Sequence, residues 1–242
     1  MIKRRFFLIL ILTFTLILLL GAFVIRGNLW YLTGQEISKI KNSNVDDEVI
    51  AKVGDTNITK KDLYIALALD KLRYEEQKKN IELFKQHGVE IQKPLDAYQM
   101  LNKIIDNELL YQEAKRLGCS VSYEEAKKFM ENVRKTDNEV LMGNIKLSEE
   151  NKKNVIDSIN NNKQFIKGLG ISESEYWQQI IKQYQKALSI SKLRERILYQ
   201  MPAEDRKIPE KVASYFDNYK KQLREKESDK VRINIKDLTI TK

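Results

Sequence analysis

The stretch from Phe6 to Ile25 carries no charged residue and directly follows Lys3, Arg4 and Arg5. A helix of about 20 residues rises about 30 Å, which is the thickness of the hydrocarbon core of a bilayer. All but four residues of the stretch are Leu, Ile, Phe or Val, and each of these favours insertion by roughly 0.3–0.6 kcal/mol at mid-membrane. The stretch therefore predicts an N-terminal transmembrane helix.

The charges on either side of this stretch predict its orientation. Three basic residues precede it and only Arg26 follows it, so the positive-inside rule places the N-terminus in the cytoplasm and residues 27–242 outside. A cleaved signal peptide is the alternative, but its apolar core is normally about 7–15 residues and ends in a small-x-small site. The nearest match here, Leu20-Gly21-Ala22, begins with a large residue. Residues 1–26 are therefore expected to be a retained signal-anchor of a single-pass cell-membrane protein.

Few turn-forming residues interrupt the rest of the chain. The whole sequence has 3 Pro and 9 Gly, and 32% of its residues are charged. This composition is typical of long amphipathic helices and disfavours a sandwich or barrel, which needs many turns. We expect a mostly α fold.

The charge balance argues against a nucleic-acid-binding protein, and the single cysteine argues against a disulfide-linked or cysteine-metal fold. The net charge is +9, but Lys and Arg alternate with Glu and Asp throughout, as on solvated helix faces, so we expect no nucleic-acid partner. Cys119 is alone, so it can form neither an internal disulfide nor a cysteine-based metal clip. Neither a metal nor a cofactor is expected.

Strand-like segments occur near both ends of the exported part. Residues 27–47 are polar and weakly periodic, which predicts a spacer before a folded domain at 48–242. Residues 49–59 indicate a short hairpin around Gly54, and Val231–Ile235 alternates like a strand. Since a strand needs a partner, the two chain ends should meet in a small sheet.

Helix-start signals divide the region between these strands. Thr59, Ser122 and Ser172 are each followed three residues later by an acid, which is the pattern of a capping box. Ser148 and Pro209 suit the starts of two further helices. The expected helices span residues 60–85, 96–117, 123–133, 149–167 and 173–199, and a last one begins at Pro209.

The order of these segments resembles a known family. Ile50–Leu63 has the form of a hairpin around a glycine turn followed by a Thr-capped helix, Leu101–Leu117 forms a central helix, and Gly118–Glu125 forms the next turn. Together with Gly170–Arg196, this order is similar to the N-terminal chaperone domain of the SurA and PrsA family of extracytoplasmic folding factors. The resemblance implies a helical module, with a small sheet, that binds unfolded or newly secreted polypeptides.

The resemblance does not extend to the prolyl isomerase that members of this family commonly carry. The residues after Met201 are too few for a parvulin-type domain, and His87 is the only histidine, whereas the family's isomerase site uses a pair. No nucleophile elbow, phosphate loop or zinc helix is present, so no catalytic residue is expected. Two alternatives to a chaperone stay open, namely a divergent or truncated peptidyl-prolyl isomerase and a scaffold in a membrane complex.

Apolar and aromatic side chains on the predicted helices are the candidates for peptide binding. Burial of apolar surface gains roughly 25 cal/mol per Å² without requiring a fixed client sequence. Tyr and Trp suit such a surface because one end of each ring system is polar. Each of these side chains could instead belong to the core. The candidates are Tyr64, Leu67, Tyr74, Phe84, Tyr176, Trp177 and Tyr184.

Overall fold

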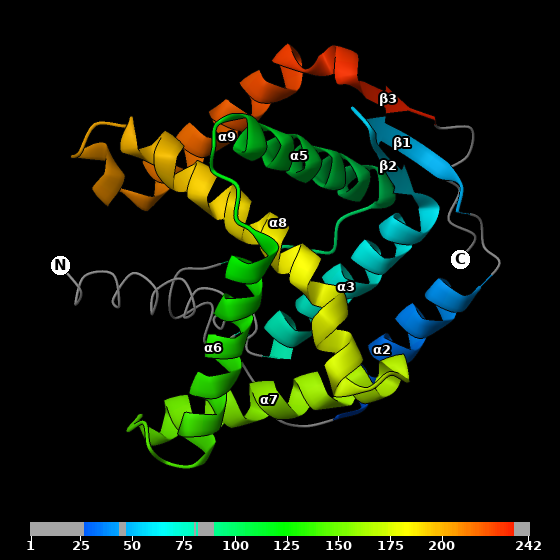
Figure 1. The fold of residues 1–242 in the computed structure, drawn as a ribbon, viewed down its shortest axis with the longest axis vertical. Coiled ribbons are helices and arrows are strands. Elements are labelled where there is room, and N and C mark those ends of the chain that lie inside the picture. Colours follow the sequence, from blue (N-terminus) through cyan, green and yellow to red (C-terminus); the bar gives the residue numbers. More distant parts are fainter. Residues whose placement is uncertain (1–26, 44–46, 80, 82–89, 235–242) are drawn as a thin grey trace. The chain divides into compact units, whose positions relative to one another are not determined.

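The computed structural model describes residues 27–43, 47–79, 81 and 90–234. This part of the chain is mostly helical and contains a three-stranded antiparallel sheet (Figure 1), which confirms the predicted fold class in its coarse form. The predicted span Phe6–Ile25, Phe84 and His87 lie outside the described residues. None of the helices in the described ranges is long and apolar enough to cross a membrane.

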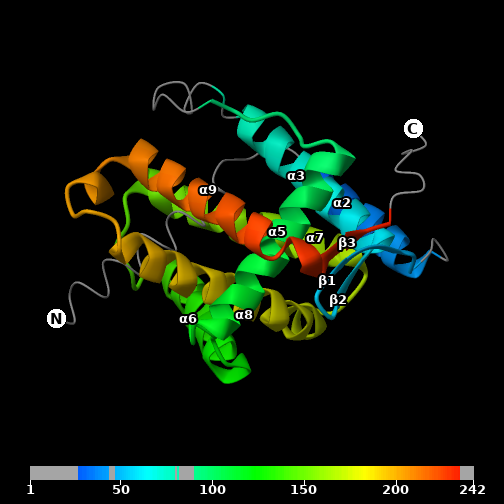
Figure 2. The ribbon, with the colours of Figure 1, turned by 90° about the horizontal axis from the view of Figure 1, so that it is seen from above.

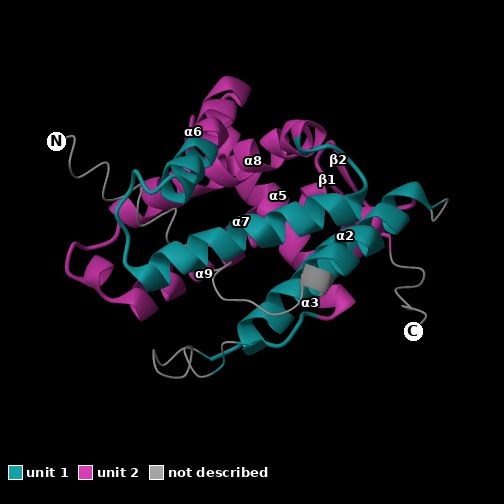
Figure 3. Cartoon of the chain, turned by 90° about the horizontal axis from the view of Figure 1, so that it is seen from below, with its two compact units in different colours: residues 1–43, 65–95, 133–173 teal, residues 44–64, 96–132, 174–242 magenta. Residues whose placement is uncertain are grey.

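The chain divides into two compact units that interleave in sequence (Figure 3). Unit 1 contains residues 1–43, 65–95 and 133–173, and unit 2 contains residues 44–64, 96–132 and 174–242. Helices α3 (Lys60–Lys79) and α6 (Tyr123–Leu141) each contribute residues to both units.

The sheet belongs to unit 2 and joins the hairpin at residues 49–59 to the last strand, as predicted. Its strands are β1 (Val49–Val53), β2 (Thr56–Thr59) and β3 (Val231–Ile233), in the order β2-β1-β3. Ala51 pairs with Ile58 on one side and with Ile233 on the other. The N–H of Asn234 continues the β1–β3 pairing by donating to the carbonyl of Ile50 (2.9 Å).

The β1–β2 hairpin is fixed to α5 (Ala97–Arg116) by polar side chains. Gln112 Nε2 donates to the carbonyl of Val53 (2.8 Å), and Thr56 Oγ1 donates to Glu108 (2.9 Å). Gly54 lies in the turn with φ +56°, and a Cβ there would be 3.1 Å from Gln112 Oε1. The turn therefore favours glycine for both its backbone conformation and its close approach to α5.

Helix α5 has the ends that its sequence predicts. Asp96 caps its N-terminus by accepting from the N–H of Gln99 (2.8 Å). At the other end Gly118 has φ +70°, and the N–H of Cys119 donates to the carbonyl of Ala114 (2.8 Å), as in a Schellman motif. The apolar face of α5 supplies much of the core: Leu101, Ile105, Leu109, Leu110 and Ala114 are buried.

Two further helices of unit 2 begin at the predicted residues. Helix α8 spans Glu173–Tyr199, and α9 spans Pro209–Lys226 with proline in its first turn. Short 3₁₀ turns at Asp205–Lys207 and Ser228–Lys230 flank α9. Helix α9 contacts α5, and Figure 2 shows it leading toward β3. Helix α6 continues to Leu141, beyond the predicted end near residue 133.

Unit 1 contains α2 (Gly27–Asn42) and α7 (Glu149–Leu169), whose backbones touch. A Cβ on Gly34 would be 2.3 Å from the carbonyl oxygen of Phe165, and a Cβ on Gly168 would be 2.1 Å from that of Tyr31. Beside this crossing the rings of Trp30 and Phe165 meet edge to face, with centroids 6.3 Å apart. Only glycine at both positions permits this approach.

The finding at α2 corrects the prediction that residues 27–47 form a spacer and that the folded part begins near Asp47. Residues 27–42 are helical, and Thr33 and Ile37 are buried. Polar residues and two glycines made the segment look unstructured, but Gly34 is where the helix contacts α7. Residues 27–42 therefore belong to the folded part.

Candidate functional site

Helix α8 carries three of the predicted peptide-binding residues, Tyr176, Trp177 and Tyr184, within unit 2. Side chains separated by three or four positions share one helix face. Trp177, Ile180, Tyr184 and Leu188 lie on such a face and pack against a buried cluster of Val121, Ala126, Met130 and Ile181. This face of α8 therefore forms part of the core shared with α6.

The aromatic rings on this part of α8 contact one another. Tyr176 and Trp177 have ring centroids 5.2 Å apart with planes at 68°, and Tyr184 lies 6.2 Å from Phe129 on α6. Burial, with a smaller contribution from Tyr184, raises the pKa of Tyr176 to about 12. The phenol of Tyr176 is therefore neutral at physiological pH, and the rings are half-buried amphipathic groups.

The other predicted binding residues do not join this group in unit 2. Tyr64 is half-buried near the start of α3 and belongs to unit 2, whereas Leu67 and Tyr74 are half-buried on the part of α3 that belongs to unit 1. Phe84 lies outside the described residues. The structure thus brings together only the three candidates on α8.

Polar residues of α8 hold the turn between α5 and α6, and the sequence interpretation missed them. Ser189 Oγ accepts from the N–H of Val121 (3.0 Å), and Gln185 Nε2 donates to the carbonyl of the same residue (3.0 Å). Further along, Lys192 pairs with Glu125 (3.5 Å) and Arg196 donates to the carbonyl of Leu117. The spacing 185, 189, 192 and 196 places these side chains on one helix face, and this spacing is the signal that could have revealed them.

An open depression of about 510 Å³ lies beside this polar face, near the end of α8. Its lining combines charged groups with long aliphatic stems and one aromatic ring. Tyr199 is 78% exposed, and the guanidinium of Arg206 lies 5.0 Å from the centre of its ring. The lining residues are Lys192, Glu195, Arg196, Tyr199 and Gln200.

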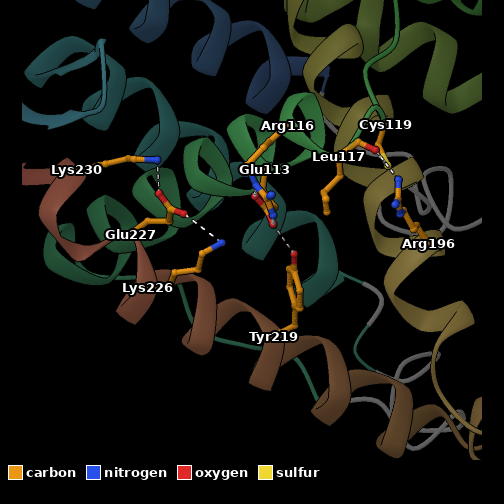
Figure 4. A network of polar contacts seen from close by, with 9 residues as sticks. All are labelled: Glu113, Arg116, Leu117, Cys119, Arg196, Tyr219, Lys226, Glu227 and Lys230. Carbon is orange, nitrogen blue, oxygen red and sulfur yellow. Dashed lines mark hydrogen bonds and ion pairs between the residues drawn. The ribbon is translucent and has the colours of Figure 1, made fainter.

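A network of polar contacts joins α5 to the C-terminal segment (Figure 4). The guanidinium of Arg116 binds both carboxylate oxygens of Glu113 at 2.6 Å, and the hydroxyl of Tyr219 donates to the same carboxylate (3.1 Å). Near the end of α9, Glu227 forms ion pairs with Lys226 (3.5 Å) and with Lys230. The Tyr219–Glu113 bond attaches α9 to α5, and the two Glu227 ion pairs hold the turn from α9 into β3.

The network shifts the pKa values of its members in the directions expected for stable ion pairs. The hydrogen bond from Arg116 holds the pKa of Glu113 below its ordinary value, although burial opposes this. The hydrogen bond from Lys230 likewise lowers the pKa of Glu227. Burial first, and then the negative charge of Glu113, raise the pKa of Tyr219 to about 12. Glu113 is therefore ionised and Tyr219 neutral over the physiological range.

These groups offer apolar area, hydrogen-bond donors and cations for non-covalent binding. No group of three or more His, Cys, Asp or Glu residues in the described ranges could hold a metal ion. Cys119 is buried, with its Sγ 3.8 Å from the carbonyl oxygen of Leu117. Such a thiol behaves as a small packed side chain.

Comparison with known proteins identifies the family. A family model described as the SurA-like N-terminal domain matches residues 2–140. The match begins before α2 and ends within α6, whereas the resemblance seen in the sequence extended to Arg196. No curated protein and no solved structure matches the chain. Because the match covers more than half of the sequence, the chain belongs to the family of proteins with a SurA-like N-terminal domain.

Proposed function

We propose that the protein is a membrane-anchored chaperone that binds unfolded segments of newly translocated proteins outside the cytoplasm. The observation that carries the proposal is the match of the SurA-like N-terminal domain to residues 2–140. The uncharged stretch Phe6–Ile25 behind three basic residues supports the anchor and its orientation. The proposed binding is reversible and needs no cofactor.

Helix α8 is the proposed client-binding element. Tyr199 supplies an exposed ring at the open depression near its end. The half-buried rings of Tyr176, Trp177 and Tyr184 on its first half stay predicted contacts, although Trp177 and Tyr184 also pack against the buried cluster. The aliphatic stems of Lys192 and Arg196 can cover apolar client groups while their charged ends stay in water. Because apolar burial is non-directional, such a surface accepts many sequences. Tyr64, Leu67, Tyr74 and Phe84 stay predicted contacts.

Suppression of client aggregation by the full chain tests the function. The chain is reconstituted in lipid nanodiscs and mixed with a reduced, unfolded client whose aggregation is followed by light scattering. We expect suppression at a several-fold molar excess of the chain over the client. Absence of suppression at that excess would contradict the chaperone proposal. The full chain is used because a truncation to residue 40 would delete most of α2, which contacts α7.

A matched pair of tyrosine variants tests the binding surface. Tyr199→Ser removes the exposed ring beside the depression, whereas Tyr98→Ser removes a ring that is 57% exposed on α5. Both changes should leave the fold intact, since both rings face solvent. We expect Tyr199→Ser to weaken suppression several-fold and Tyr98→Ser to leave it near the wild-type level. Equal effects of the two variants would argue against a site on α8.

A further inference from the structure

The turn that joins α6 to α7 exposes a concentrated group of large apolar side chains in unit 1. Met142 is 73% exposed and Leu141 is 44% exposed, and Ile145 and Leu147 are each 37% exposed. All four lie within residues 141–147, and Lys146 is the only charged residue in that range. Isolated apolar residues are common on protein surfaces, but four exposed large ones within seven residues call for a partner.

The turn exposes these side chains although its backbone is well held. Gly143 adopts φ +76°, and the N–H of Asn144 donates to the carbonyl of Glu139 (2.9 Å). The side-chain amide of Asn144 also donates to the carboxylate of Glu139 (2.7 Å). These contacts close the end of α6 in the manner of a Schellman turn. The apolar side chains are therefore presented by an ordered turn.

The same unit contains α2, which begins two residues after the uncharged stretch ends at Ile25. Helices α2 and α7 are in contact at Gly34 and Gly168, and they run in the same sense in both views of the pair (Figures 1 and 3). The N-terminus of α7, and with it the apolar turn, therefore points in the direction from which the chain enters α2.

The lengths of the two helices place the turn near the level where α2 begins, or beyond it. At about 1.5 Å per residue, α7 measures about 28 Å from Glu149 to Gly168, and α2 measures about 10 Å from Gly27 to Gly34. If the helices crossed at about 60°, the part of α7 before the contact would still extend about 14 Å along the axis of α2. This distance is longer than the part of α2 that precedes the contact, which measures about 10 Å. The turn thus extends at least as far as Gly27, where α2 begins.

We propose that residues 141–147 dip into the outer surface of the membrane that holds Phe6–Ile25. The inference rests on the anchor in the proposed function. Leu141, Met142, Ile145 and Leu147 supply the apolar face of an interfacial contact. The ammonium group of Lys146 can reach the lipid phosphates while its stem stays among the acyl chains. Two fixed points, the span and the turn, then set the orientation of unit 1 above the lipid.

The occupant is the bilayer rather than an anionic macromolecule. Residues 139–153 contain three glutamates and three lysines and therefore carry no net charge, so charge attraction to an acidic partner is not the driving force. The contact should therefore persist in vesicles of zwitterionic lipid and at high salt, because apolar burial is not screened.

A depth measurement on the full chain tests the proposal. A fluorophore that responds to polarity is attached at Met142→Cys or, as a control, at Asn42→Cys, which is exposed at the far end of α2. Both variants carry Cys119→Ala, so that each has one thiol. The chains are reconstituted in phosphatidylcholine vesicles that contain lipids with a nitroxide near the headgroup. We expect blue-shifted emission and several-fold stronger quenching at position 142 than at position 42.

The outcomes separate the inference from the anchor on which it rests. Flotation of the vesicles reports whether the chain is anchored at all, and loss of flotation would contradict the anchor and the inference together. Flotation with equal, weak quenching at both positions would overturn the inference alone. A response at position 142 to an added unfolded client, without quenching by lipid, would assign the turn to client binding and would also overturn the membrane contact.

Discussion

The hydroxyl of Tyr219 on α9 donates a 3.1 Å hydrogen bond to the carboxylate of Glu113 on α5. Glu113 is only 6% exposed and is also bound by Arg116. Glu113 lies within the matched range 2–140, and Tyr219 lies outside it. The contact therefore joins α9, which lies outside the matched range, to α5, which lies within it.

Substitution Tyr219→Phe should destabilise unit 2. The change keeps the ring and removes one donor from a buried, ionised carboxylate, which typically costs about 1.5–3 kcal/mol. The free energy of unfolding of the detergent-solubilised chain, measured in denaturant by circular dichroism, checks this expectation. The control is Tyr98→Phe, which removes a hydroxyl from a ring that is 57% exposed. A loss of equal size in the control would show that the bond to Glu113 contributes nothing.

Acid should weaken the protein through Glu113. Its pKa in the folded chain lies below the ordinary value of 4.5, chiefly because of the hydrogen bond from Arg116. A carboxyl group with a lowered folded pKa stabilises the fold above its unfolded pKa, and this contribution is lost as the pH falls through the folded value. We expect the free energy of unfolding to fall below about pH 4.5 and to fall less steeply in Glu113→Gln. Parallel pH profiles of the two proteins would contradict this account.

Local sequence patterns predicted where α3 and α6 begin because the physical causes of a helix start are local. The side chain of Asp62 accepts from Thr59 N–H (2.8 Å), and that of Glu125 accepts from Ser122 N–H (2.7 Å), as the capping-box pattern requires. The pairing of β3 with β1 was predicted because the sequence offered a single possible partner for the last strand. These predictions needed no knowledge of tertiary packing.

The contacts that the sequence did not reveal depend on distant residues. Gly34 looked like part of a polar spacer because the glycine that it meets, Gly168, lies in another helix far along the chain. Ser189 looked like one polar residue among many on α8, and only the fold places the N–H of Val121 beside it. Trp177 and Tyr184 were predicted as candidates for peptide binding that could instead belong to the core, and periodicity alone could not show which buried cluster they contact.

Removal of the Ser189 hydroxyl should destabilise the turn between α5 and α6. Ser189 is fully buried, and its Oγ accepts from Val121 N–H and donates to the carbonyl of Gln185 (2.7 Å). Ser189→Ala leaves a buried N–H without this partner, at a cost of about 1–3 kcal/mol. Ser191→Ala, on another face of the same helix, should change the free energy of unfolding little. Equal values for the two variants, measured in denaturant, would exclude a special role for Ser189.

Glu108 on α5 and Lys186 on α8 form an ion pair, so substitutions of the two residues should have non-additive effects on the free energy of unfolding. The Glu108 side chain is only 6% exposed and also accepts from Thr56 and Gln112, whereas that of Lys186 is about a third exposed (34%). Lys186→Met leaves the buried carboxylate without its cation, and allowing for solvent screening this should cost about 1–3 kcal/mol. Glu108→Gln in the same chain should recover part of the loss, since the uncompensated charge is gone. A double-mutant cycle of unfolding free energies with no coupling would contradict this.

The contact between α2 and α7 predicts that alanine, normally a better helix former than glycine, will be harmful at Gly34. In an exposed helix, Gly→Ala gains about 0.8–1.0 kcal/mol. At Gly34, however, the added Cβ would be 2.3 Å from a backbone oxygen of α7, so the helices must move apart at a cost of about 1–3 kcal/mol or more. The free energy of unfolding in denaturant should therefore fall in Gly34→Ala. Asn160→Ala, at an exposed position of α7, is the control and should be neutral or slightly stabilising. Stabilisation by Gly34→Ala would mean that the two helices do not touch in solution.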